Sequence, residues 1–412
     1  MRKPRLPAVP LAIALALAAA AAPVDAQRVP APHVLATLPG TTERPAMVYG
    51  TWLTRDRAGR LYLGTGSGGV TVYAPGGGPG RRLEGSLNRR DMGGTPGWMG
   101  DTLTISSFRR WEMVGPDGGN LGCHPLERWS EFDTQLFDVL PLAGGLYAGN
   151  MMPPWPQEAG DALVVARGTR QSEVVRTLAR RPPLPESVKV PEPWSGGGTW
   201  VVDSPLFAVP EWSVADDGGA AVVVDQAAPA GPGAQTVRVS RLRMSGDTVY
   251  SVALRVPALA VSEAWRERQI REWLEPPPGI RVTLRDPAAA FDAFRRIVRF
   301  PAYHPPVAGV LAGVDGSAWL RLASDGDLAT WVRLDSAGAE RERVALPAAF
   351  QATYADGDGV WGVLPAVDGS ARVVQFPDAR PFADRPLELL PEPEPEPNGS
   401  VNLPGGCPAA SR

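Results

Sequence analysis

The feature that most constrains this chain is a short turn-and-strand signature that recurs along it. Each copy is a Gly or Asp turn followed by a few residues typical of strands. Aligned on the residue that opens the strand, the copies begin at positions 61, 103, 146, 220, 318 and 360. Three of the five intervals are 42 or 43 residues, the length of a four-stranded propeller blade. The recurrence predicts an all-β chain folded as a six-bladed β-propeller.

The two longer intervals, of 74 and 98 residues, should contain insertions. In the first, residues 180–198 are so rich in Pro and Gly that we expect an extended loop without sheet pairing. In the second, Asp286 followed by Pro287 is a helix start signal, and residues 261–274 are another helical candidate. We therefore expect a small helical insertion over residues 258–300. Its apolar stripe, which should face the propeller, is Phe291, Phe294, Ile297 and Val298.

Residues 34–38 precede the first complete repeat, and we expect them to pair with the last blade and close the ring. Closure removes sheet edges that would otherwise invite aggregation. The composition agrees with many short strands joined by tight turns, because 46 Gly and 45 Pro accompany 13 Trp. Trp319 and Trp361 lie within the signature, so we expect both in the core between blades.

The N-terminus has the pattern of a secretory signal peptide over residues 1–26. Arg2, Lys3 and Arg5 precede an apolar run over residues 11–22, and small residues surround a cleavage position after Ala26. The alternative is a membrane anchor, which needs about 18 or more apolar residues. We expect a periplasmic or secreted protein that has no transmembrane anchor once the signal is removed. Residues 27–386 would form the propeller, and residues 387–412 a Pro/Glu-rich tail.

The charge balance argues against nucleic acid as a partner. The formal net charge is −3 at pH 7, and no basic stripe offsets it. The two cysteines, Cys123 and Cys407, favour one disulfide in an oxidising compartment, which would tie the tail to the body. Two free thiols are the alternative.

Two segments resemble a known family. The run from Tyr303 to Arg321 contains His304-Pro305-Pro306 and an Asp-Gly turn, and Trp98 to Leu103 follows Gly-rich loops. Both are similar to exported six-bladed β-propeller proteins of the NHL-repeat type, common in soil and environmental bacteria. The similarity covers most of residues 33–380. It implies the fold and export, and no particular activity, because members of this family generally have none assigned.

Propeller enzymes suggest what catalytic residues to seek. Calcium-dependent lactonases of this shape are similar in needing Glu, Asn and Asp ligands around the axis, to which Asn150 and Glu211 would correspond here. Propeller-type lyases need several His ligands, and this chain has only His33, His124 and His304 in unrelated contexts. No nucleophile elbow is present, so we assign no catalytic residue, no metal ligand and no cofactor.

Aromatic side chains are the stronger candidates for binding. Trp155 and Trp194 lie in Pro- or Gly-rich loops, where they either face a ligand or plug a loop onto the domain. With Glu211, Trp212 and His304 they form the candidate ligand-binding set. The leading hypothesis is a non-enzymatic binding or interaction module of the cell envelope for a peptide, a glycan or a partner protein. The alternative is a metal-dependent hydrolase or lyase with its site at the channel mouth.

Overall fold

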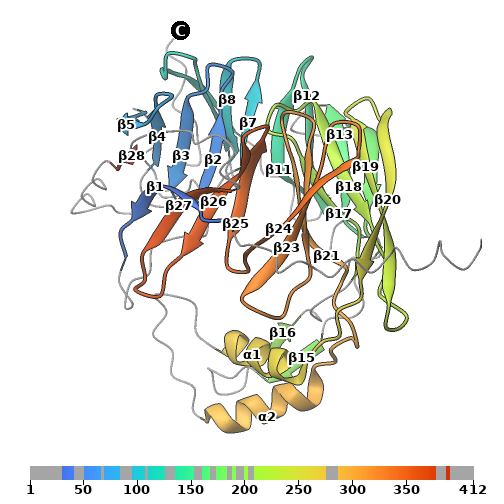
Figure 1. Cartoon of the computed structure of the whole chain (residues 1–412). Coiled ribbons are helices and arrows are strands. Elements are labelled where there is room, and N and C mark those ends of the chain that lie inside the picture. Colours follow the sequence, from blue (N-terminus) through green and yellow to red (C-terminus); the bar gives the residue numbers. More distant parts are fainter. Residues whose placement is uncertain are drawn as a thin grey trace, which may run out of the picture.

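Six antiparallel sheets of four strands each form a closed ring in the computed structural model of this chain (Figure 1). The structure describes residues 30–40, 51–65, 69–83, 95–106, 110–125, 135–152, 160–167, 173–182, 188–191, 199–202, 208–274, 286–376 and 387–389. Each sheet is one blade, so the chain is a six-bladed β-propeller, as its repeat predicts.

Blades 1 to 3 take their strands in chain order, with β5 (Gly78–Pro79) of blade 1's chain segment left out of the sheet. Blade 1 is β2 (Trp52–Arg55), β3 (Leu61–Thr65), β4 (Gly69–Tyr73) and β6 (Arg81–Arg82). Blade 2 is β7 (Thr95–Met99), β8 (Thr102–Ser106), β9 (Arg110–Val114) and β10 (Asn120–Pro125). Blade 3 is β11 (Gln135–Leu142), β12 (Leu146–Met152), β13 (Ala162–Arg167) and β14 (Glu173–Arg180).

Blades 4 and 5 follow the same order, and blade 6 completes the ring. Blade 4 is β17 (Glu211–Val214), β18 (Ala220–Asp225), β19 (Ala234–Arg243) and β20 (Thr248–Pro257). Blade 5 is β21 (Val307–Ala312), β22 (Ala318–Leu322), β23 (Leu328–Leu334) and β24 (Glu340–Pro347). Blade 6 is β25 (Gln351–Asp356), β26 (Gly359–Pro365), β27 (Ala371–Phe376) and β1 (His33–Leu38).

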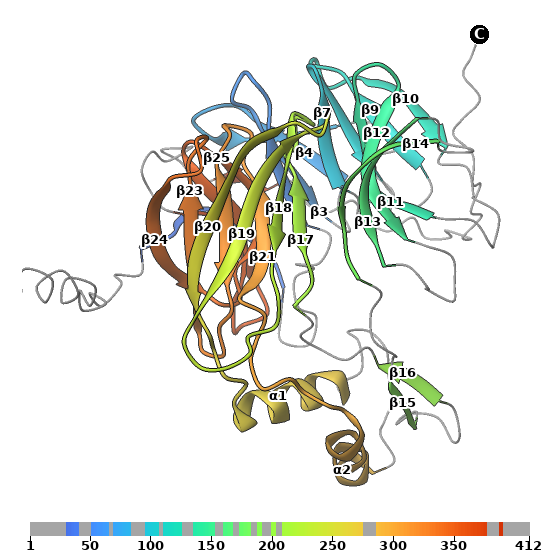
Figure 2. The ribbon, with the colours of Figure 1, turned by 90° about the vertical axis from the view of Figure 1, so that its right-hand side faces the viewer.

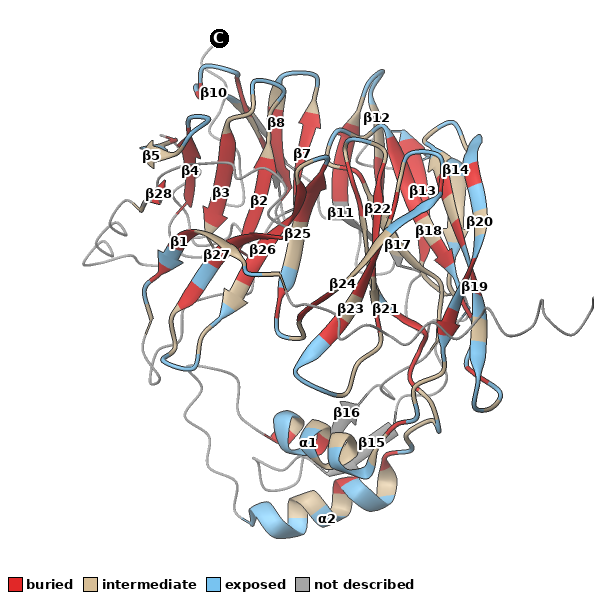
Figure 3. Ribbon diagram, in the orientation of Figure 1, coloured by how far each residue is buried: buried red, intermediate tan, exposed pale blue. Residues whose placement is uncertain are grey.

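The recurring signature marks the second strand of every blade. The six predicted positions fall in β3, β8, β12, β18, β22 and β26. These strands are paired on both sides, and Figure 3 shows them mostly buried where their side chains are described. Trp319 and Trp361 are fully buried, which confirms their place in the core between blades.

The N-terminal strand closes the ring. β1 pairs antiparallel with β27, with His33 opposite Gln375 and Leu38 opposite Ala371. Leu35 is fully buried in a cluster that joins blades 1 and 6 through Leu53 and Trp361. The predicted pairing of residues 34–38 with the last blade is therefore confirmed. A closed ring protects the inner edges of its blades from pairing with other chains.

The expected tail also contributes a short strand. β28 (Leu387–Glu388) pairs in parallel with β5 (Gly78–Pro79), beside blade 1. Leu387 is buried against the cluster that contains Leu35. The first residues of the expected tail are thus packed on the propeller.

The first insertion contains paired strands, so the expectation of a loop without pairing is wrong for part of it. β15 (Val188–Pro191) pairs antiparallel with β16 (Thr199–Val202). The only Pro in β15 stands at its end, on a two-stranded hairpin, where Pro is tolerated. The Pro and Gly around β15 obscured its two Val residues, Val188 and Val190, which favour a strand.

The second insertion contains the two predicted helices, α1 (Glu263–Leu274) and α2 (Pro287–Ile297). Asp286 is the N-cap of α2, and its carboxylate accepts a hydrogen bond of 2.9 Å from the amide of Ala289. The expectation that the apolar face lies on the propeller is wrong. The buried residues Ile270, Leu274, Phe294 and Val298 form a cluster of their own between the helices. The insertion is a helical hairpin that buries its apolar face internally.

Both insertions lie at the same end of the propeller. One precedes β17 and the other precedes β21, so each leaves the ring where an inner strand begins. Figures 1 and 2 show α1, α2, β15 and β16 together beyond this end, and α2 contacts β15. We call this end the insertion face. Of the helices described, neither is long and apolar enough to cross a membrane.

Candidate functional site at the insertion face

A guanidinium group links blades 3 and 4 at the insertion face. Arg181 follows β14, and its Nη2 lies 3.0 Å from Oε2 of Glu211, the first residue of the inner strand β17. Its Nε donates to the carbonyl of Pro210 at 2.9 Å, and its Nη1 lies 3.7 Å from a carboxylate oxygen of Asp161. Arg181 therefore contacts both blades through charged and backbone groups.

Trp212 fills the space beneath this guanidinium. The guanidinium carbon of Arg181 lies 4.3 Å from the centre of the Trp212 ring, a cation–π distance. The indole N–H donates to Oδ1 of Asn150, at the end of β12, at 2.5 Å. Asn150, Arg181, Glu211 and Trp212 thus form one connected polar and aromatic cluster, which we call the blade 3–4 cluster.

Close backbone packing fixes where Arg181 leaves the blade. The amide of Arg181 donates to the carbonyl of Asp161 at 2.7 Å. A Cβ atom at Gly160 would collide with the carbonyl oxygens of Arg181 and Pro182. Only Gly lets the two segments approach this closely, so Gly160 is part of the geometry that aims Arg181 at β17.

Glu211 is a partly desolvated carboxylate. Burial raises its pKa, and the opposing effect of the neighbouring Arg181 does not fully cancel that rise. About a third of the side chain is still exposed, at 30%. The carboxylate therefore remains accessible at the surface while one of its oxygens is held by Arg181.

Gln226 joins blades 4 and 5 at the same face. Its side-chain amide donates to the carbonyls of Val209 and Val307, both at 3.0 Å, and its oxygen accepts from the amide of Val307 at 2.8 Å. The buried amide thus makes three hydrogen bonds, two of them across the boundary to blade 5. It fixes the chain just before two inner strands.

His304 lies in the neck of the helical hairpin. The neck is a short antiparallel pair in which Ala260 faces Tyr303 and the amide of His304 donates to Leu259 O at 2.9 Å. The imidazole is buried, and its centre lies 4.9 Å from that of the Trp265 ring. Burial lowers the pKa of His304, against a smaller opposing effect of Asp325. The imidazole thus packs Trp265 of α1 against the chain that leads into β21.

The opposite end of the channel is closed by polar contacts among inner strands. The indole N–H of Trp98 donates to Oγ1 of Thr54 at 2.8 Å, and the Thr54 hydroxyl is hydrogen-bonded to the Asp216 carboxylate. Beside them, Arg55 forms ion pairs with Asp356 at 2.5 Å and Asp358 at 2.9 Å. This end is built from internal contacts of the ring.

The structure brings some of the predicted site residues together. Glu211 and Trp212 are in the blade 3–4 cluster, together with Asn150, and His304 lies at the same face in the hairpin neck. Trp155, Trp194 and Cys407 lie outside the described residues. Cys123 is in β10, opposite Glu112. Its pairing with Cys407 stays a prediction.

Sequence reasoning missed Arg181 as a site residue. It is the second of two consecutive arginines before Pro182, and nothing in that pattern distinguishes it from Arg180. Its partner Glu211 is 30 residues away. The only available signal was the change from a strand to a Pro-rich stretch, which marks Arg181 as the last residue before the insertion.

The described residues hold no group of three or more His, Cys, Asp or Glu side chains arranged to bind a metal ion. Oδ1 of Asn150 accepts a hydrogen bond from the indole of Trp212, and Oε2 of Glu211 accepts one from Arg181.

The fold and this face define a β-propeller of six blades with two insertions at one mouth. No family model matches the chain, and no curated protein matches it significantly. Several solved structures are similar to it. A calcium-binding protein, regucalcin, from Agrobacterium tumefaciens has 12% identity over 88% of this chain and 98% of its own, with a TM-score of 0.36.

Two further structures have comparable scores. The PQQ domain of pyranose dehydrogenase from Coprinopsis cinerea has 11% identity over 85% of this chain and 98% of its own, with a TM-score of 0.39. The Pan2 WD40 domain from Neurospora crassa has 10% identity over 82% of this chain and 91% of its own, with a TM-score of 0.31. These superpositions are loose, so the assignment of the fold rests on the order of strands in the six sheets.

Proposed function

We propose that this protein is an exported binding or interaction module of the cell envelope, of the NHL-repeat type. Its insertion face would hold a peptide, a glycan or a partner protein. One observation carries the proposal: two insertions from separate blade junctions lie at the same face and contact each other. Loops and insertions held by a rigid scaffold are where proteins most often place binding residues.

The blade 3–4 cluster gives this face a suitable chemistry. It offers a planar guanidinium stacked on an indole, a partly exposed carboxylate and an amide. Such groups recognise polar and aromatic ligands through hydrogen bonds and stacking. The signal-like N-terminus supports export, and the excess of acidic over basic residues supports a partner other than nucleic acid.

Removal of the helical hairpin tests the proposal. Ala260 faces Tyr303 across the neck, and the Val261 amide donates to Ala302 O at 2.9 Å, so an Asn-Gly turn can replace residues 262–301. The apolar cluster of the hairpin contains only hairpin residues and leaves with it. The deletion removes no residue of the four large apolar clusters of the propeller, although it uncovers His304, which packs on Trp265.

The intact and the shortened chain would be screened side by side against peptide and glycan arrays. We expect ligands that bind the intact chain and are lost from the shortened one, with the propeller still folded by circular dichroism. Ligands that bind both forms equally would place recognition elsewhere. Stoichiometric calcium or zinc in the purified protein would favour the metal-dependent hydrolase or lyase instead.

A further inference from the structure

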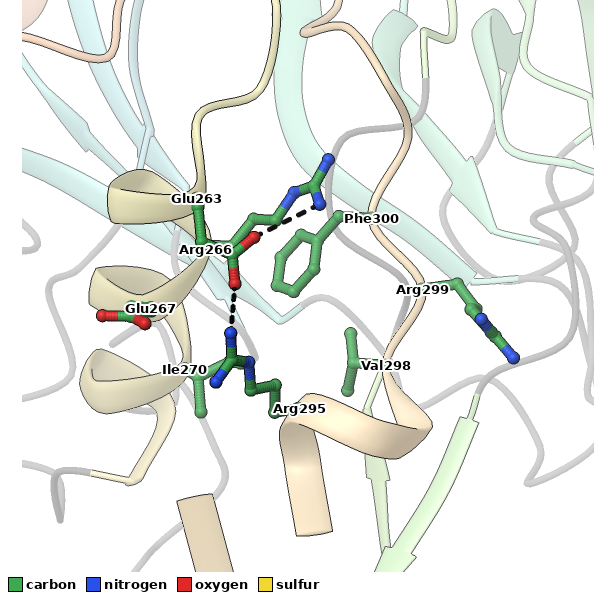
Figure 4. A pocket seen from close by; sticks show the side chains of 8 residues that line it. All are labelled: Glu263, Arg266, Glu267, Ile270, Arg295, Val298, Arg299 and Phe300. Atoms are coloured by element: carbon green, nitrogen blue, oxygen red, sulfur yellow. Dashed lines mark hydrogen bonds and ion pairs between the residues drawn. The ribbon is translucent and has the colours of Figure 1, made fainter. Parts of the chain in front are cut away.

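A small cavity lies within the helical hairpin itself (Figure 4). Its volume is about 230 Å³, and it is formed by α1, α2 and the chain that returns from α2 to the propeller. Ligand pockets are commonly about 300–1,000 Å³, so this one fits a single side chain or a small molecule. It is lined by Glu263, Arg266, Glu267, Ile270, Arg295, Val298, Arg299 and Phe300.

Three apolar residues line the cavity beside its five charged ones. Ile270 and Val298 are buried there, and Phe300 is half-buried. Trp273 stacks on Phe300 with ring centres 5.9 Å apart and planes 9° from parallel. Trp265 meets the same ring edge-on at 5.9 Å. The Phe300 ring is thus held in place by two indoles, and an apolar body placed on it would meet a preformed surface.

The rim carries more hydrogen-bond donors than acceptors. Glu263 of α1 lies 2.8 Å from Arg295 of α2 and 3.5 Å from Arg266, so one carboxylate is shared by two guanidinium groups. The other carboxylate, Glu267, pairs with Arg271, outside the lining, at 3.2 Å. The Nε of Arg266 is buried without a hydrogen-bond partner among the described residues. A guanidinium has five N–H groups, so the rim still has donors to offer.

Figure 4 shows how these groups are arranged. The Glu263 carboxylate lies between the guanidinium groups of Arg266 and Arg295, and Phe300 and Val298 lie across from them. Arg299 is at the rim with its guanidinium directed outward. An anionic group entering here would meet Arg266 and Arg295 while the body attached to it covered Phe300.

We propose that this cavity binds a small apolar group that ends in a carboxylate, either a free acid or the C-terminal residue of a peptide. The apolar body would lie on the half-buried Phe300, and the carboxylate would take up the spare donors of Arg266 and Arg295. The proposal rests on the proposed function, because the hairpin belongs to the insertion face, and it names a ligand class for that face.

Calorimetric titration of the intact chain with four probes tests the proposal. The probes are 3-phenylpropionate, its neutral analogue 3-phenylpropanol, a short peptide ending in a free Phe carboxylate, and the same peptide amidated. We expect one of the two carboxylates to bind, and its neutral partner to bind about tenfold more weakly or not at all. Which carboxylate binds distinguishes a free acid from a peptide end.

Arg295→Gln is the decisive variant and Arg296→Gln its matched control. Both residues are exposed on α2, but Arg296 is outside the lining and its Nε bonds to the Asp292 carbonyl of its own helix at 3.2 Å. We expect Arg295→Gln to weaken carboxylate binding about tenfold and Arg296→Gln to leave it unchanged, with equal melting temperatures.

Three results would overturn the inference: no binding of either carboxylate, equal binding of charged and neutral probes, or equal effects of the two Arg variants. Each of these leaves the proposed function standing if array ligands still require the hairpin. Conversely, array ligands that bind the intact and the shortened chain equally would contradict the proposed function. The carboxylate titration would still decide whether the cavity binds an acid.

Discussion

The backbone amide of Trp98 donates a hydrogen bond of 2.6 Å to the carbonyl oxygen of Asp216. Trp98 is in blade 2 and Asp216 follows the inner strand of blade 4, so the bond joins blades that are not neighbours. Thr54 of blade 1 is hydrogen-bonded to both residues through its hydroxyl. Three blades therefore meet at one buried carboxyl group, at the end of the channel opposite the insertions.

Replacement of Asp216 by Asn should make the protein more stable than wild type, and the difference should grow as the pH rises. Burial raises the pKa of Asp216 to about 7, chiefly by disfavouring the charged form, with the Asp217 carboxylate adding to the rise and Thr54 opposing it. The unfolded chain binds the Asp216 proton with a pKa of about 4, and below that pH the neutral carboxyl contributes its full stabilisation to the folded state. This stabilisation is lost as the pH rises through 7, where the buried carboxyl must ionise. The Asn variant carries no charge to bury.

Urea unfolding of Asp216→Asn and the wild type at pH 5 and pH 8 checks this prediction. We expect the advantage of the variant to be larger at pH 8, by an amount on the order of 1–3 kcal/mol. Asp225→Asn is the control, because Asp225 is exposed at the end of β18. If the free energy of unfolding changed equally with pH in wild type and in Asp216→Asn, the Asp216 carboxyl would not have a raised pKa.

Arg181→Gln should destabilise the junction of blades 3 and 4. The change removes the ion pairs to Glu211 and Asp161 and the cation–π contact with Trp212, and leaves Glu211 partly buried without its cation. Hydrogen bonds to charged groups contribute about 1.5–3 kcal/mol, so we expect a loss of that order at pH 7. The loss should be smaller at pH 4, where a carboxyl with a raised pKa is largely protonated and needs no cation.

The adjacent Arg180 supplies the matched control. It is exposed, and its Nη2 lies 3.5 Å from Oγ1 of Thr177 in its own strand. Chemical denaturation of Arg180→Gln should agree with wild type within about 0.5 kcal/mol. Equal effects of the two substitutions would mean that Arg181 does not hold the blades together.

The sequence predicted correctly those helices and strands whose positions are determined by a few neighbouring residues. The second strand of each blade follows its Gly or Asp turn directly, and α2 begins at its Asp-Pro signal, so a few neighbouring residues decide each element. β15 was missed because its four residues are surrounded by Pro and Gly, and a composition taken over 19 residues hides them.

The contacts of the site depend on distant parts of the chain. Trp212 meets Asn150 across 62 residues, and Arg181 meets Glu211 across 30. Those contacts follow from blade order and from the direction in which the chain leaves β14, neither of which a local pattern contains. The packing of the helical hairpin on itself was missed for a related reason. The apolar stripe of α2 indicates that the helix packs against another part of the chain, but the stripe does not show that this part is α1.

Leu35→Ala should weaken closure of the ring. Leu35 is fully buried between blades 1 and 6, so its truncation should cost about 2–5 kcal/mol. Thr37, two residues along β1 on its exposed side, is the control, and Thr37→Ala should cost less than about 1 kcal/mol. Thermal unfolding compares the two, and similar losses for both would show that β1 is not packed into blade 6.

The disulfide stays a prediction that peptide mapping can decide. A bond between Cys123 and Cys407 would close a loop of nearly 285 residues and would contribute about 4–5 kcal/mol by restricting the unfolded state. Mapping under non-reducing conditions, on protein exported to an oxidising compartment, should recover the linked peptide. Free thiols at both positions, or a Cys407→Ser variant with an unchanged melting temperature, would reject a stabilising bond.

The most direct test of the account is a hydrogen-exchange footprint of the intact chain with a ligand retained from the arrays. If the insertion face is the binding surface, the ligand should protect amides at residues 208–214 and 259–304 and leave the turns at 56–60 and 356–359, at the opposite end of the channel, unchanged. Protection confined to those turns, with exchange at residues 208–214 and 259–304 unaffected, would contradict the central claim.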